Sequence, residues 1–249
     1  MKLELLNVTK TYQGRTVLQL ENIIFESGKK YAILGPNGSG KTTLLRIASA
    51  ILKADQGAIH YNGDPRLPGE RIAYLPQKPY LFNTTVQGNL TFAMDTGTRV
   101  KRENARMRAE CALEALGMKN FSRAKAGNLS GGEAQKVALL RTLVLGKDLV
   151  LLDEPTAAVD MPSMKRVEDY ITNVIRKNHS TLIFSTHNPS QAARMADEII
   201  ILWDGRMVEK GPCHQVLFES RQKETREFLQ YWAVGIDKGG GAVALDHYV

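Results

Sequence analysis

The stretch "GPNGSGKT", residues 35–42, decides the fold. It matches the pattern G-x-x-x-x-G-K-[ST], follows the apolar segment "KKYAILG" and precedes "KTTLLRIASAIL", whose apolar residues recur at helical spacing. A strand, a glycine-rich turn and a helix in this order form the context in which the pattern binds phosphate, because glycines let backbone N–H groups surround an anion. Lys41 can reach the outer phosphates of a nucleotide, and the Thr42 hydroxyl can bind Mg²⁺. The alternative, a chance glycine-rich turn, does not account for a match at all four specified positions of the pattern in this context.

An acidic pair supplies the partner that a metal-dependent phosphate site needs. The segment "LVLLDE" is an apolar run ending in Asp153 and Glu154, as expected of a buried strand. Since neighbouring residues of a strand point in opposite directions, we expect the two carboxylates to have different roles. Asp153 is suited to hold Mg²⁺ through water, and Glu154 to polarise the attacking water as general base. A charged strand end that meets solvent is the alternative.

The remaining sequence predicts an α/β fold. Residues 1–30 alternate apolar and polar positions and predict antiparallel strands. Residues 101–118 predict a helix with Met107 and Cys111 on its apolar face, together with Leu113 or Leu116, and Gly117 as its stop. A second helix is predicted over residues 131–146.

Strands and helices then alternate, as in a doubly wound sheet. Residues 148–155 and 180–187 predict buried strands, residues 164–178 and 189–198 predict helices, and residues 199–211 predict a hairpin that turns at Asp204 and Gly205.

Composition bounds the class of protein. The chain has 249 residues, of which 43% are hydrophobic and 24% charged, which is typical of a soluble globular protein. The net charge of +7 allows either a solvated basic surface or a polyanionic partner. Five basic residues between positions 99 and 108 lack interleaved aromatics, so we expect a solvated helix face and no nucleic-acid partner. Cys111 and Cys213 have no metal-like spacing and predict packed, reduced thiols. No apolar run reaches about 18 residues, so a membrane role would need a partner.

With Lys41 and Asp153, the pentapeptide "LSGGE" (residues 129–133) carries a family resemblance. The chain resembles the ATP-binding subunit, or nucleotide-binding domain, of ABC transporters over about residues 1–230. The resemblance implies a P-loop NTPase core with a mainly parallel sheet, an N-terminal antiparallel β subdomain and an inserted α-helical subdomain at about residues 84–146. The expected ATPase domain covers residues 1–232, and a flexible glycine-rich tail covers residues 233–249.

The resemblance also assigns roles to residues outside the first loop. It implies that Tyr12 stacks on adenine, that Gln77 contacts Mg²⁺ or the attacking water, and that His187 contacts the γ-phosphate. Asp160 ends the segment "AAVD", where the family more often has Ser-Ala-Leu-Asp. The aspartate itself is retained, so the resemblance implies that Asp160 contacts the other subunit of a dimer. The alternatives are an ordinary strand tyrosine, a loop glutamine and a structural histidine.

In this family two subunits pack head to tail. Each ATP lies between the glycine-rich loop of one subunit, here residues 35–42, and the LSGGE pentapeptide of the other subunit, called the signature, here residues 129–133. The resemblance implies that the Ser130 hydroxyl and the amides of Gly131 and Gly132 meet the γ-phosphate, although Ser130 is also suited to cap a helix. The complete nucleotide set expected is Tyr12, Gly35, Pro36, Asn37, Gly38, Ser39, Gly40, Lys41, Thr42, Thr43, Ser130, Gly131, Gly132, Glu133 and Asp160. The catalytic set is Glu154, His187 and Gln77, and the Mg²⁺ set is Thr42, Gln77 and Asp153.

The partners implied are ATP, Mg²⁺, a second ATPase subunit and a transmembrane permease at the cytoplasmic face of the cell membrane. For an importer, an extracytoplasmic solute-binding protein is added. Residues 75–94 are similar to those of oxyanion importers, notably for tungstate and more distantly phosphate, and Tyr80, Leu81 and Phe82 suit either permease docking or packing. An exporter subunit, or a soluble ABC ATPase acting on nucleic acid or the ribosome, is the alternative.

Overall fold

The structure, a computed structural model, describes residues 1–92, 94 and 98–232. The chain divides into two compact units. Among the described residues, the first contains residues 1–68 and 181–232, and the second lies between residues 69 and 180. The predicted tail, residues 233–249, lies outside the described residues.

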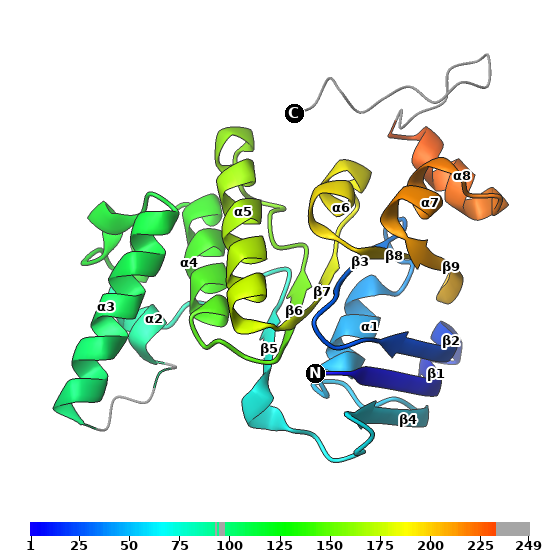
Figure 1. The fold of residues 1–249 in the computed structure, drawn as a ribbon, viewed down its shortest axis with the longest axis horizontal. Helices are drawn as coiled ribbons and strands as arrows, with labels where there is room; N and C mark the ends of the chain where they lie inside the picture. The colour runs from blue at the N-terminus through cyan, green and yellow to red at the C-terminus, as the bar shows by residue number, and fades with distance from the viewer. Residues whose placement is uncertain (93, 95–97, 233–249) are drawn as a thin grey trace. The chain divides into compact units, whose positions relative to one another are not determined.

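A three-stranded antiparallel sheet opens the first unit (Figure 1). Strands β1 (Leu3–Tyr12), β2 (Arg15–Phe25) and β4 (Gln56–Tyr61) lie in the order β2-β1-β4. Alternate residues of β1, such as Leu3 and Leu5, are fully buried, as the period of two in the sequence predicts. The antiparallel strands expected over residues 1–30 are therefore confirmed.

The parallel strands of the first unit surround β3 (Lys30–Leu34). Strands β7 (Thr181–Ser185) and β8 (Glu198–Trp203) pair with β3 in parallel, and β9 (Arg206–Pro212) pairs with β8 in antiparallel fashion. The hairpin turns at Asp204 and Gly205, both with left-handed φ values, of 44° and 75°. This turn is the one predicted, and paired left-handed residues match the twist of a two-residue hairpin.

In the part of the first unit that the structure describes, four helices accompany these strands. Helix α1 (Lys41–Ala48) follows β3 and ends earlier than the predicted residue 52, and α6 (Pro189–Met195) follows β7. Two short helices that the sequence analysis did not predict, α7 (Cys213–Phe218) and α8 (Lys223–Gln230), come after β9.

The second unit combines two parallel strands with a helical segment. Strand β5 (Ile72–Leu75) pairs with β6 (Leu149–Asp153), all five residues of which are buried. Helix α4 (Gly131–Leu143) contacts α2 (Val86–Phe92), α3 (Arg99–Ala115) and α5 (Met161–Asn178) (Figure 1). The described residues of this unit also form short 3₁₀ turns at Gly69–Arg71, Lys119–Phe121 and Ala126–Asn128.

The predicted apolar face of α3 is wrong for Met107 and Cys111, whereas the predicted leucines Leu113 and Leu116 are both buried. Met107 is 58% exposed and Cys111 is exposed, so the packed thiol expected at Cys111 is absent. The buried stripe instead consists of Ala105, Ala109, Ala112, Leu113 and Leu116. These positions follow the i, i+4, i+7, i+8, i+11 spacing of one helix face, and alanine lets the helix approach its neighbours closely. Met107 and Cys111 lie one turn apart on the opposite side. Cys213 is half-buried, so it fits the predicted packed thiol better than Cys111 does. Burial raises the pKa of the Cys213 thiol.

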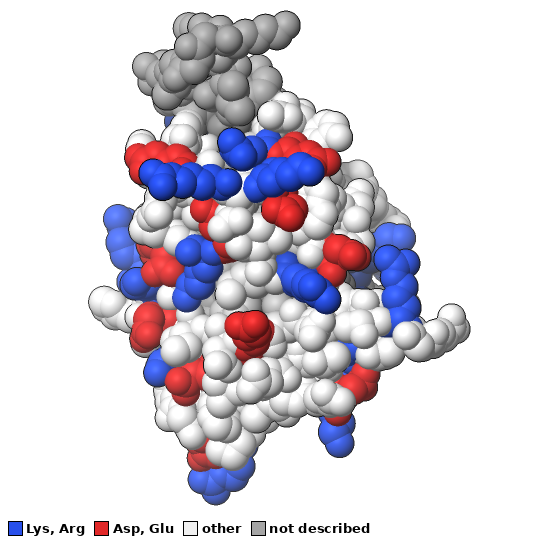
Figure 2. All heavy atoms as spheres, turned by 90° about the vertical axis from the view of Figure 1, so that its right-hand side faces the viewer, with Lys and Arg blue, Asp and Glu red and all other residues white. Residues whose placement is uncertain are grey.

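The predicted fold class is confirmed: strands, helices and strand pairing are those of a P-loop NTPase fold with an antiparallel β sheet and inserted helices. Among the described residues, no helix is both long and apolar enough to cross a membrane. On the face shown in Figure 2, basic and acidic side chains are interspersed. Ion pairs in the first unit include Lys10 with Asp55 and Lys29 with Glu198.

Candidate functional site

The glycine-rich loop of the first unit leads from β3 into α1. Three of its glycines have φ values that side chains rarely adopt: 148° at Gly35, 81° at Gly38 and 101° at Gly40. Gly40 is the N-cap of α1, and no side chain there accepts a hydrogen bond from the helix. The backbone N–H groups of the first turn therefore lack a side-chain acceptor from the N-cap residue. A curled loop that ends on uncapped amides at a helix N-terminus is suited to bind an anion.

Two polar side chains of the loop fit a phosphate group. Ser39 is 2% exposed, and its buried Oγ has no hydrogen-bond partner among the described residues. The Lys41 ammonium is also buried and donates to the carbonyls of Gly35 and Pro36, at 2.8 and 2.9 Å. A buried hydroxyl costs free energy unless it is hydrogen-bonded, and a phosphate oxygen would satisfy it. These residues therefore fit the nucleotide phosphates predicted from the sequence.

Gly35 is the most crowded position of the loop, which gives a first prediction. A Cβ added there would lie 2.1 Å from the Leu202 carbonyl oxygen and 2.8 Å from Ser39 Oγ. We expect Gly35→Ala to destabilise the fold by about 2–4 kcal/mol, because clash and backbone strain add. The control is Gly63→Ala, where φ is 82° but nothing lies within 4 Å; its cost is conformational, about 1–2 kcal/mol. Urea unfolding compares the two, and equal losses would contradict the prediction.

Tyr12 ends β1 as a partly exposed ring. Its side chain is 46% exposed, and Lys10 Nζ lies 5.4 Å from the ring centroid. Lys10 is itself held by Asp55, whose carboxylate lies 2.7 Å away. The ring is therefore accessible at the end of a rigid strand, where an aromatic base could stack.

In the second unit, the backbone separates the acidic pair in a way that differs from the expectation. Asp153 is the last residue of β6 and is 1% exposed. Glu154 has already left the strand and has a left-handed φ of 47°. Strand alternation therefore does not apply to this pair, because the backbone leaves the strand after Asp153. A non-glycine residue held in this region is strained, as residues at functional sites often are.

The structure brings Gln77 and Glu154 together within the second unit. Gln77 Nε2 donates to Glu154 Oε2 at 3.1 Å, so two of the three predicted catalytic residues are in contact. Gln135, which the sequence analysis missed, is 2% exposed and donates from Nε2 to the Pro155 carbonyl at 3.3 Å. The signal for Gln135 was a polar residue among the apolar positions of α4, and its bond holds the backbone just after Glu154.

The signature begins α4 with a capping box. The Ser130 hydroxyl accepts from Glu133 N at 3.4 Å, and the Glu133 carboxylate accepts from Ser130 N at 2.8 Å. The hydrogen bond from the Ser130 backbone N–H lowers the pKa of Glu133. A Cβ at Gly132 would lie 2.6 Å from the Ala158 carbonyl oxygen, so glycine permits close contact with the segment before Asp160. The Ser130 cap suggested by the sequence is present, and Glu133 belongs to the same cap.

Asp160 is an N-cap as well. Its side chain accepts from Ser163 N at 3.1 Å at the start of α5, and Lys136 Nζ lies 3.3 Å from its carboxylate. Hydrogen bonding to Ser163, with a smaller contribution from Lys136, lowers the pKa of Asp160. Lys136 was not predicted from the sequence; it links α4 to the start of α5.

His187 lies in the first unit between β7 and α6. The backbone around it is fixed, because Thr186 N donates to the Ile33 carbonyl at 3.1 Å and Asn188 caps α6. Its imidazole ring is exposed and faces Trp232, with ring centroids 5.6 Å apart. Trp232 was not predicted as a site residue.

No group of three or more His, Cys, Asp or Glu side chains within the described part of the chain could hold a metal by itself. Mg²⁺ commonly binds one or two protein oxygens together with substrate phosphates. The buried Asp153 carboxylate and the Thr42 hydroxyl are donors of this kind.

A family model described as "ABC transporter" matches residues 19–157. The chain belongs to this family. It is 39% identical over 210 residues to the tungstate uptake system ATP-binding protein TupC of Peptoclostridium acidaminophilum, which covers 84% of this chain and 98% of that protein. It is 34% identical over 240 residues to the phosphate import ATP-binding protein PstB 2 of Natronomonas pharaonis, and the match covers 89% of this chain and 84% of that protein.

Among solved structures, the chain is similar to the dimeric ATP-binding cassette MJ0796 in a post-hydrolysis state bound to ADP and Pi. The TM-score is 0.77 at 26% identity, with 85% of this chain and 98% of that chain covered. The family and these likenesses make the chain an ABC-type ATPase that binds ATP.

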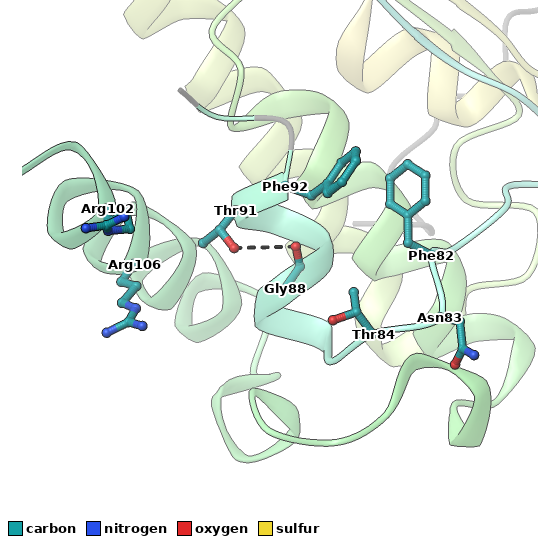
Figure 3. Close-up of a pocket in the computed structure, with 8 residues that line it drawn as sticks. All are labelled: Phe82, Asn83, Thr84, Gly88, Thr91, Phe92, Arg102 and Arg106. Atoms are coloured by element: carbon teal, nitrogen blue, oxygen red, sulfur yellow. Dashed lines mark hydrogen bonds between the residues drawn. The ribbon is translucent and has the colours of Figure 1, made fainter. Parts of the chain in front are cut away.

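The second unit of this ABC ATPase also carries an open pocket (Figure 3). Its volume is about 620 Å³, and Phe82, Phe92, Arg102 and Arg106 are among the residues that line it. The two phenylalanine rings face one another with centroids 4.5 Å apart, while the two arginines come from α3. Within the described residues, neither Arg102 nor Arg106 has an ion-pair partner.

Proposed function

We propose that this chain is the ATP-hydrolysing subunit of an importer, that it dimerises around two ATP molecules, and that it drives a separate membrane permease. The observation that carries the proposal is the phosphate loop, with its uncapped helix N-terminus and buried Ser39 hydroxyl. The hydrogen bond between Gln77 and Glu154 supports the hydrolytic role. The family makes a permease partner the expected one.

Each site residue has a proposed task in hydrolysis. Residues 35–43 and Tyr12 bind ATP, and Lys41 neutralises the outer phosphates. Thr42 and Asp153 are the residues that would each offer an oxygen ligand to Mg²⁺, and the ion would supply positive charge next to the phosphates. Glu154 accepts a proton from the attacking water, and Gln77 orients Glu154 through the 3.1 Å hydrogen bond.

We further propose that the signature acts on the ATP held by a second copy of the chain. Ser130, Gly131 and Gly132 begin α4, and its N-terminus favours negative charge. His187 and Asp160 complete the closed dimer. Because ATP binds the closed state in preference to the open one, binding shifts the population toward the dimer and hydrolysis reverses this shift.

The proposed cargo is tungstate or a related oxyanion, supplied by an extracytoplasmic binding protein. The likeness to a tungstate uptake ATPase supports this choice, and the likeness to a phosphate import ATPase keeps phosphate as the second candidate. Reconstitution with the co-purified permease and binding protein in liposomes tests it. We expect tungstate to stimulate ATP hydrolysis more than phosphate does. Stimulation by a solute added on the opposite side of the membrane would indicate an exporter. Co-purification of a ribosome in place of a permease would indicate a soluble ATPase.

The proposed permease contact is the aromatic surface formed by Tyr80, Phe82 and Phe92. The exposed fractions of these rings are 71%, 36% and 69%. Arg141 holds the loop that carries Tyr80 and Phe82, because it lies over the Phe82 ring at 4.9 Å and donates to the Tyr80 carbonyl at 2.6 Å. Phe92 is the last residue of α2 and contacts the Phe82 ring. Exposed aromatic rings that are held in place in this way are suited to bind an apolar segment of a partner protein. The arginines in the adjacent pocket favour a segment that carries a carboxylate beside an apolar side chain.

Charge reversal at the pocket tests this contact. We expect Arg102→Glu with Arg106→Glu to weaken permease binding about tenfold or more, because like charges then face each other. Lys165→Glu with Lys177→Glu is the matched control, since it makes the same charge change on exposed positions of α5. Permease co-purification and melting temperature are measured for both. If the permease is retained equally by both variants, the docking surface lies elsewhere.

A further inference from the structure

We infer that Trp232 positions His187 for catalysis, and that the end of the chain's last described helix thereby contributes to ATP hydrolysis. The inference rests on the proposed role of His187 at the γ-phosphate. The ring centroids are 5.6 Å apart and the planes are inclined by 37°. This distance lies within the range at which aromatic rings attract one another.

The contact with Trp232 is one that can set the direction of the His187 ring, because the backbone alone does not. Thr186 N donates to Ile33 O, and Asn188 N donates to Thr186 Oγ1, so the main chain is fixed on both sides. The imidazole itself is exposed. An exposed side chain can change rotamer on a fast timescale, whereas a ring stacked on a neighbour keeps one orientation for more of the time.

Trp232 is itself held by a well-anchored helix. Helix α8 buries Thr225, Phe228 and Leu229, and Thr225 Oγ1 donates to Glu209 on β9 at 2.7 Å. Trp232 N donates to the Leu229 carbonyl at 3.0 Å, which continues the chain from the helix. The indole is 38% exposed, so much of its surface is covered. The anchor therefore extends from β9 through α8 to the His187 ring.

The inference assigns a function to a segment that carries none of the motif residues. A γ-phosphate contact requires the imidazole nitrogen within hydrogen-bond reach, and small misplacements are costly to the rate. Trp232 does not touch ATP in this scheme. It acts on the rate only through the fraction of time that His187 spends in the productive orientation.

Kinetics of Trp232 variants in the full chain test the effect. We expect Trp232→Ala to lower kcat about two- to tenfold, the factor that an aromatic pair supplies, with a smaller change in KM for ATP. Trp232→Phe keeps a ring and should restore most of the rate. The control is Tyr231→Ala, which removes the neighbouring aromatic side chain, 81% exposed. An unchanged or higher kcat in Trp232→Ala would overturn the inference.

Two further measurements separate this inference from the role of His187. In a Trp203→Phe background Trp232 is the only tryptophan of the chain, and we expect His187→Ala to change its fluorescence. An unchanged emission would refute the ring contact whatever the kinetics. Conversely, wild-type kcat in His187→Ala would refute the proposed catalytic role. If both hold, Trp232→Ala should have little further effect in the His187→Ala background, because coupled residues are not additive.

Discussion

Glu154→Gln is expected to lower kcat for ATP hydrolysis by about 10²- to 10⁴-fold, the contribution of a positioned general base. The activation barrier would then be higher by roughly 3–5 kcal/mol. Glutamine has nearly the same shape, and its carbonyl oxygen can still accept the hydrogen bond that Gln77 Nε2 donates at 3.1 Å. The substitution therefore removes the basic carboxylate and leaves the contact in place.

ATP binding should survive this change, so the variant should accumulate as an ATP-bound dimer. Single-turnover hydrolysis and light scattering in the presence of Mg²⁺ and ATP measure the two effects. Glu70→Gln is the control, because it removes one exposed carboxylate from the same unit. Wild-type turnover in Glu154→Gln would show that another group accepts the proton.

Ser130→Arg is expected to lower the rate of ATP hydrolysis by at least about 10²-fold, as the loss of a hydrogen-bond donor to the transition state does. The ATP affinity of the monomer is expected to stay nearly unchanged. The reason is the proposed arrangement in which Ser130 serves the nucleotide of the other copy. Its hydroxyl lies at the N-terminus of α4, where a long cationic side chain would occupy the space of the incoming phosphate.

A cap is lost at the same time, and a control must account for it. Removing the Ser130 cap costs about 1 kcal/mol of stability. Thr98 caps α3 by accepting from Lys101 N at 3.2 Å, so Thr98→Arg removes a similar cap and adds the same charge outside the signature. Equilibrium dialysis measures ATP binding and a phosphate-release assay measures turnover. Loss of monomer ATP binding in Ser130→Arg would place Ser130 in the site of its own chain.

The parts of this fold that the sequence predicted correctly depend on local patterns. The turn at Asp204 and Gly205, the buried strand that ends at Asp153 and the Ser130 cap all follow from residues adjacent in the chain. The apolar face of α3 failed for a related reason. Met107 is a large apolar residue and suggests a core position, although the stripe that packs is set by helical spacing and includes alanines.

The parts of the candidate site that could not be predicted depend on contacts distant in sequence. Gln77 and Glu154 are 77 residues apart, and their hydrogen bond follows from the pairing of β5 with β6. Trp232 and His187 are likewise brought together by packing of α8, a helix that the sequence analysis did not predict. The left-handed φ of Glu154 has no local signal either, since glutamate does not favour that region.

The exposure of Cys111 gives the helical segment a selective chemical handle. The chain has two cysteines, and burial raises the pKa of Cys213, which keeps that thiol protonated and slow to react. Cys111 lies exposed on α3, the helix that also carries Arg102 and Arg106. A maleimide dye would thus attach to α3 of the native chain without any engineered residue, and its emission would report when a permease segment settles against that helix.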